Sequence, residues 1–114
     1  MGWHKVLLKS DIAKDEITQV TVDQLTIALY NLDGKIYATA NMCTHAPACL
    51  AEGFVEGDLI ECPRHMGSFH IPTGKPVNQP AEVPLRTYEV REEGEDVYVQ
   101  IPDQEIALYI NHLV

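Results

Sequence analysis

Four side chains that can bind a metal ion gather in two short segments in the middle of the chain. Cys43 and His45 form the first segment, and Cys62 and His65 form the second after sixteen intervening residues. Each segment therefore offers one thiolate and one imidazole, which are ligands for zinc and iron. Such a concentration rarely arises by chance in a chain with three cysteines and five histidines. We interpret the four residues as the ligands of one metal centre.

Two kinds of metal centre are compatible with these residue types. A tetrahedral zinc site shares two thiolates and two imidazoles around one ion. A [2Fe–2S] cluster binds one iron through two cysteines and the other iron through two histidines. Zinc sites usually group like ligands, two cysteines and then two histidines, whereas here each segment is mixed. The spacing favours the two-iron cluster, and zinc remains the alternative.

The residues around the four candidate ligands have little periodicity of their own. Residues 41–80 contain five of the seven prolines and four of the seven glycines. Metal ligation is therefore expected to stabilise this stretch, which has too few regularly spaced apolar residues to hold its shape alone. Cys49 lies between the two segments, and the odd number of cysteines argues against a disulfide framework. We expect Cys49 to be a buried free thiol.

Strand-like patterns on both sides of this stretch must position the ligands. Asp33-Gly34 is a strong signal for a β-hairpin, and Gly94 lies in a second candidate turn. A helical turn is expected at Ser10-Asp11, and residues 103–114 show helical spacing, with a last edge strand as the alternative. Short strands with turns between them predict an antiparallel sandwich or barrel. The expected strands are 3–9, 17–22, 25–32, 35–40, 85–91 and 96–101.

Composition limits the classes of partner and location. The 114 residues suffice for one domain, and 17 acidic against 8 basic residues give a formal net charge of −9. A chain this acidic repels nucleic acid and anionic lipid, and its acidity serves either solubility or docking to basic proteins. No apolar run approaches the roughly 18–20 residues of a membrane span, and the first residues lack a secretory core. We therefore expect a cytoplasmic protein.

The metal-binding pattern continues into a longer motif. Cys-x-His, sixteen residues and Cys-x-x-His are followed by MGSF and then by TGK. This order resembles the signature of bacterial Rieske-type ferredoxins. It is most similar to the small ferredoxin components of aromatic-ring-hydroxylating dioxygenase systems, such as those acting on biphenyl, naphthalene or carbazole. The resemblance extends over nearly the whole chain up to residue 101.

The resemblance implies a fold and a ligand set. The fold is all-β: an antiparallel β-sandwich basal part of residues 1–41 and 81–114 with a small cluster-binding β subdomain of residues 42–80, together one Rieske domain. One Rieske-type [2Fe–2S] cluster is implied, with Cys43 and Cys62 on the inner iron and His45 and His65 on the outer iron. The remaining histidines are expected to be surface or hydrogen-bonded residues without a role at the cluster; they are His4, His70 and His112.

The resemblance also implies a function. The chain would carry one electron at a time from an NAD(P)H-dependent flavin reductase to a terminal Rieske non-haem iron oxygenase, in transient complexes and as a monomer. It would have no catalytic residues of its own. The alternatives are a Rieske subunit of another redox enzyme, such as a nitrite or arsenite system, or a structural zinc-binding interaction module.

The chain departs from the respiratory branch of this family close to the second ligand segment. Arg64 replaces a cysteine of that branch, and Gly67 and Phe69 provide no hydroxyl where that branch donates hydroxyls to the cluster. Fewer hydrogen-bond donors leave a reduced cluster less stabilised. We expect a potential near the low end of the Rieske range, roughly −150 mV, which suits electrons from NADH.

Overall fold

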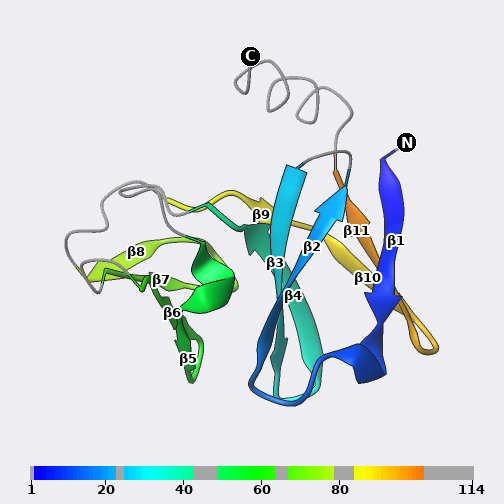
Figure 1. Ribbon diagram of the computed structural model, residues 1–114, viewed down its shortest axis with the longest axis horizontal. Helices are drawn as coiled ribbons and strands as arrows, with labels where there is room; N and C mark the ends of the chain where they lie inside the picture. Colours follow the sequence, from blue (N-terminus) through cyan, green and yellow to red (C-terminus); the bar gives the residue numbers. More distant parts are fainter. Residues whose placement is uncertain (1, 23–24, 43–48, 64–66, 79–83, 102–114) are drawn as a thin grey trace.

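Three antiparallel sheets make up the computed structural model, which describes residues 2–22, 25–42, 49–63, 67–78 and 84–101 (Figure 1). One sheet has the order β1 (Trp3–Leu8), β11 (Asp96–Gln100) and β10 (Val90–Glu93). The second has the order β2 (Ile17–Val22), β3 (Leu25–Leu32), β4 (Lys35–Ala40) and β9 (Thr87–Tyr88). The third, which we call the small sheet, has the order β5 (Phe54–Glu56), β6 (Leu59–Glu61), β7 (Ser68–His70) and β8 (Pro76–Asn78).

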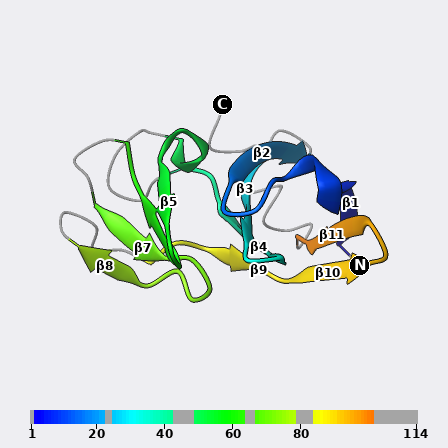
Figure 2. The same ribbon diagram turned by 90° about the horizontal axis from the view of Figure 1, so that it is seen from below.

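The small sheet lies at one end of the molecule and the β1–β11–β10 sheet at the other. Both views place the β2–β3–β4 strands between them (Figures 1 and 2). Two short 3-10 turns, η1 (Lys9–Asp11) and η2 (Leu50–Glu52), complete the described elements. In the described ranges, no helix has the length and apolar character needed to cross a membrane. The all-β architecture expected from the sequence is confirmed.

Strand β3 is buried on both faces, which explains its nearly continuous apolar sequence. Ile27 and Leu29 belong to a core shared with Val97 and Val99 of β11. Residues of the opposite face belong to a second core that includes the small sheet. Because successive side chains of a strand point to opposite faces, one strand supports both cores. The β3 members of the second core are Ala28, Tyr30 and Leu32.

The predicted hairpin between β3 and β4 is confirmed. Asp33 and Gly34 have φ angles of 53° and 95°, as a two-residue turn with both central residues left-handed requires. The Asn31 side chain stabilises the turn, because its Oδ1 accepts a hydrogen bond from the Gly34 N–H at 2.8 Å. Its Nδ2 donates to the Ile12 carbonyl at 2.9 Å. One buried amide thus fixes both the hairpin and the segment that precedes β2.

Three predicted strands have other boundaries in the structure, and one of them, expected at 96–101, ends at Gln100. The strand expected at 85–91 is divided at Glu89, because β9 pairs with β4 whereas β10 pairs with β11. Its alternating pattern continues through Glu89, so periodicity cannot reveal the change of sheet. The first strand ends at Leu8 instead of residue 9, because the Leu8 N–H donates to the Asp11 carboxylate at 2.9 Å and η1 begins at Lys9. The predicted helix at 103–114 lies outside the described residues.

Candidate metal centre

Of the four predicted ligands, the structure describes Cys62; Cys43, His45 and His65 lie outside the described residues. Cys62 directly follows β6 and is 1% exposed. It belongs to the second core, together with Ile60 and Phe69. The cysteine is therefore held by packing at a place shielded from water, as suits a thiolate ligand of a buried iron.

The second ligand segment connects β6 to β7 of the small sheet, and contacts between these two strands hold its two ends together. The Cys62 N–H donates a hydrogen bond to the Gly67 carbonyl at 2.8 Å. Next to this bond, Glu61 of β6 is paired with Ser68 of β7. These contacts fix both ends of the connection that carries His65.

The first ligand segment is closed in a similar way. Met42 and Cys49 form an antiparallel bridge, and the Leu50 N–H donates to the Asn41 carbonyl at 2.7 Å. The chain that carries Cys43 and His45 therefore starts and ends at one point of the structure. Closed ends limit the positions that the two ligands can adopt.

The bases of the two ligand segments are in direct contact. Gly53, which follows η2, lies so close to the Glu61 carbonyl that an added Cβ would collide with its oxygen. Leu50 of η2 and Cys62 belong to the same core. The end of the first segment therefore lies next to the start of the second segment. Such an arrangement is required if both segments supply ligands to one metal centre. The donor set of two thiolates and two imidazoles, anchored in this way, fits a [2Fe–2S] cluster.

Asn41 is a positioning residue that the sequence reasoning missed. It is fully buried, and its Oδ1 accepts a hydrogen bond from the Ala51 N–H at 3.0 Å. Its Nδ2 donates to Oε1 of Gln19 on β2, also at 3.0 Å. This amide connects η2 to the β2–β3–β4–β9 sheet across the base of the first ligand segment. The available signal was a polar residue between the end of a predicted strand and that segment.

Cys49 differs from its expected state. It is partly exposed and not fully buried, and it forms no disulfide. The neighbouring Leu50 occupies the second core instead, with no exposed surface. Packing of Leu50 leaves Cys49 at the edge of that core.

The other histidines lie away from the two ligand segments where they are described. Nδ1 of His70, the last residue of β7, forms a hydrogen bond with the Thr73 hydroxyl at 2.8 Å, in agreement with the expected hydrogen-bonded histidine. His4 lies on β1, and its Nε2 is buried without a hydrogen-bond partner among the described residues, contrary to expectation. His112 lies outside the described residues.

Side chains after the second ligand segment face inward. Phe69 has no exposed surface and packs in the second core. The Ser68 hydroxyl is buried and accepts a hydrogen bond from Nδ2 of Asn78 at 2.7 Å. Three acidic side chains of the same region are exposed, and they are Glu52, Glu56 and Asp58.

Comparison with known proteins identifies the family of this chain. Residues 2–89 match the Rieske [2Fe–2S] domain family. The ferredoxin component of the naphthalene 1,2-dioxygenase system of Pseudomonas putida is 39% identical over 99 residues, which are 87% of this chain and 95% of that protein. The biphenyl dioxygenase ferredoxin subunit of Pseudomonas sp. strain KKS102 is 39% identical over 100 residues, which are 87% of this chain and 92% of that protein.

A solved structure supports the same conclusion. It contains a complex of reduced oxygenase and oxidised ferredoxin in carbazole 1,9a-dioxygenase, and it matches with a TM-score of 0.82 and 41% identity. The match covers 86% of this chain and 92% of the other chain. The family match therefore supports a Rieske cluster and not the zinc site that the ligand types alone left open. The chain belongs to the Rieske [2Fe–2S] domain family, as a ferredoxin of the type found in aromatic-ring dioxygenase systems, and its cofactor is one Rieske-type [2Fe–2S] cluster.

Proposed function

We propose that this ferredoxin carries single electrons from an NAD(P)H-dependent flavin reductase to a terminal Rieske non-haem iron oxygenase in aromatic-compound degradation. The observation that carries the proposal is its similarity to the carbazole 1,9a-dioxygenase structure, in which a ferredoxin is bound to an oxygenase. It acts as an electron-transfer component in the cytoplasm, as a monomer that forms transient complexes. Substrate oxidation belongs to the oxygenase.

The four ligands of the proposal are Cys43 and Cys62 on the inner iron and His45 and His65 on the outer iron. When bound, the cluster supplies one-electron chemistry whose potential depends on charge and on hydrogen bonds to its sulfurs. The closed base of each segment and the contact between Gly53 and Glu61 support this assignment. We assign residues 42–80 to a cluster-binding subdomain and residues 1–41 and 81–114 to a basal part of the same domain.

Inward-facing side chains after the second ligand segment support a low reduction potential. Phe69 is buried in the second core and has no hydroxyl to donate. A cluster with few hydroxyl donors has a less stabilised reduced state, and a potential of roughly −150 mV matches electrons delivered from NADH through a flavin.

Reconstituted turnover tests the function. A flavin reductase and an aromatic-ring oxygenase are combined with NADH, and substrate oxidation is measured with and without this ferredoxin. We expect turnover to require it, and Cys62→Ser to abolish turnover together with the cluster absorption. Cys49→Ser is the matched control, since Cys49 is partly exposed and outside the ligand set, and it should retain both. Equal turnover without the ferredoxin, across oxygenases of several substrate classes, would reject the proposal.

A further inference from the structure

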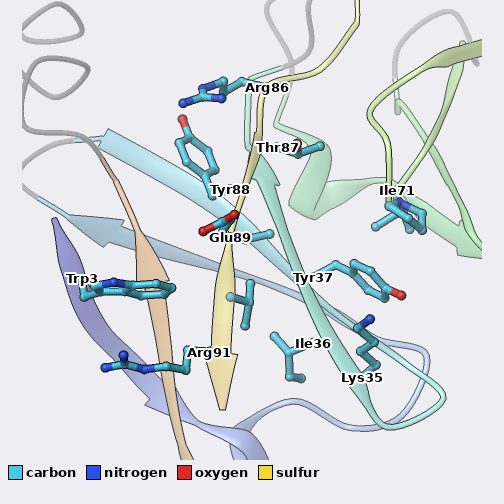
Figure 3. A pocket seen from close by; sticks show the side chains of 13 residues that line it. Trp3, Lys35, Ile36, Tyr37, Ile71, Arg86, Thr87, Tyr88, Glu89 and Arg91 are labelled. Carbon is cyan, nitrogen blue, oxygen red and sulfur yellow. The ribbon is translucent and has the colours of Figure 1, made fainter. Parts of the chain in front are cut away.

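A groove of about 690 Å³ runs along the side of the molecule where β4, β9 and β10 meet (Figure 3). Trp3 of β1 lies at one end and Ile71, which follows β7, at the other. A volume of this size is within the range of binding pockets. Cys62, the proposed ligand in the described part of the chain, does not line this groove.

The charge of the groove is opposite to that of the chain. Three of the eight basic residues line it, namely Lys35, Arg86 and Arg91, against the single carboxylate of Glu89. The whole chain carries a formal charge of −9. The small sheet and the preceding turn η2, by contrast, present the exposed acids Glu52, Glu56 and Asp58. The two regions therefore attract partners of different charge.

Each of the three cations is held over an aromatic ring. This stacking restricts the motion of the side chains. It leaves the N–H groups at the edge of an arginine guanidinium able to donate hydrogen bonds to a ligand. An ordered cation loses less entropy when it binds an anion. The distances to the ring centroids are 5.2 Å for Lys35 over Tyr37, 5.3 Å for Arg86 over Tyr88 and 4.8 Å for Arg91 over Trp3.

Acids near the groove do not prevent an anion from binding. Arg91 is paired with Glu93 at 2.9 Å, but both side chains are about half exposed, at 49% and 54%. Such surface pairs contribute little free energy and can exchange for another carboxylate. The Glu92 carboxylate is bound to Lys9 at 2.8 Å and to the Ile36 N–H at 3.3 Å. These two contacts engage the Glu92 carboxylate, and the positive charge of Lys35, which lines the groove, also helps to lower the pKa of Glu92.

We propose that this groove binds an extended acidic segment of a partner protein. Lys35 of β4, Arg86 just before β9 and Arg91 of β10 are spread along the groove, so several separate carboxylates match them better than one small anion does (Figure 3). Apolar side chains of the segment would contact Val90, which is half-buried and lines the groove. This docking site is additional to electron transfer at the cluster and leaves the acidic small sheet available to a second partner.

A peptide titration of the holoprotein tests the site. The probe is a short synthetic peptide in which glutamate alternates with leucine, and the comparison peptide has glutamine in place of glutamate. Trp3 is the only tryptophan of the chain and lines the groove, so its fluorescence reports binding there. We expect the glutamate peptide to change this emission, to bind more weakly as salt rises, and to leave the cluster absorption unchanged.

Charge-removing variants locate the binding. Lys35→Gln at the exposed first position of β4, and Arg86→Gln as a second variant, should each weaken binding about threefold to fivefold. Lys14→Gln is the matched control, because Lys14 is an exposed cation outside the groove, and it should leave the affinity unchanged. Equal binding of the two peptides, no response of Trp3, or an equal loss in Lys14→Gln and Lys35→Gln would overturn the proposal.

Discussion

The side-chain oxygen of Asn41 accepts a hydrogen bond from the Ala51 N–H at 3.0 Å, and this contact joins the two ends of the first ligand segment. The Asn41 carbonyl accepts a second bond from Leu50 at 2.7 Å. Because the amide also donates to Gln19, the segment is attached to the β2–β3–β4–β9 sheet and not only to itself. Asn41, which is outside the predicted ligand set, therefore fixes the point at which the chain enters and leaves this segment.

Asn41→Ala should reduce stability and cluster retention together. The substitution leaves the buried Ala51 N–H without its acceptor, which costs about 1–3 kcal/mol. The measurements are thermal unfolding and the rate of iron loss to a chelator. Asn31→Ala is the control, because Asn31 is a buried amide at the hairpin turn. It should lower stability comparably while iron loss from the native state stays unchanged; equal acceleration in both variants would contradict a local role of Asn41.

Gly53→Ala should disturb the contact between the two ligand segments. A methyl group there collides with the Glu61 carbonyl, so η2 and β6 must move apart. We expect lower cluster content and a visible absorption spectrum that differs from that of the unmodified protein. Gly57→Ala has no atom within 4 Å of the new methyl group, although its φ of 59° costs about 1 kcal/mol. An unchanged spectrum in Gly53→Ala would show that the contact does not position the ligands.

Glu92→Gln should reduce stability at neutral pH and not in acid. Burial is the largest influence and raises the pKa of Glu92, but the Lys9 hydrogen bond, the Ile36 N–H and the nearby positive charges together lower it below 4.5. A lowered pKa adds stability above the unfolded value, and this stability disappears as pH falls through the folded value. We expect a loss of about 0.5–1 kcal/mol at pH 7.

Denaturant unfolding between pH 7 and pH 3 checks this dependence. The curves of Glu92→Gln and the unmodified protein should converge at the acidic end. Glu93→Gln removes a more exposed ion pair and serves as the control with little effect. A constant difference at every pH would mean that packing, and not charge, accounts for the Glu92 contribution.

Removal of iron should destabilise the ligand segments locally and leave the stability of the β-sandwich unchanged. Ligation supplies stability to a region with short strands and many turns. Hydrogen exchange should become faster at the amides of Leu50 and Cys62, while Leu29 and Val97 in the first core remain protected. Protection at Leu50 and Cys62 that persists in the apoprotein would show that packing alone holds these segments.

Exposed acids of the small sheet should accelerate association with a basic redox partner. Glu52→Gln, Glu56→Gln and Asp58→Asn combined should lower the electron-transfer rate at low salt and flatten its salt dependence. The matched control removes three exposed acids elsewhere, through Glu16→Gln, Asp33→Asn and Glu95→Gln. Equal salt slopes for the two triple variants, measured by stopped flow, would exclude a specific role for the small sheet.

The sequence by itself determined the chemistry and much of the strand pattern. Mixed Cys-x-His and Cys-x-x-His spacing indicated a two-iron cluster, because ligand type and order are properties of the chain. The hairpin at Asp33-Gly34 was predicted correctly, since left-handed backbone at a two-residue turn is a local preference. The strands at 17–22, 25–32 and 35–40 were predicted with the observed boundaries, because their residue patterns are also local properties of the sequence.

Only the tertiary structure decided how distant segments meet. Alternation through residues 85–91 could not show that Glu89 separates two sheets, because pairing partners are not encoded in periodicity. The roles of Asn41 and Gly53 depend on contacts with Gln19 and Glu61, which lie far away in the chain. Trp3, Arg91 and Lys35 likewise form one groove through strand pairing. Local preferences depend on neighbouring residues and can be predicted from them. The contacts named above form only when the sheets pack around β3.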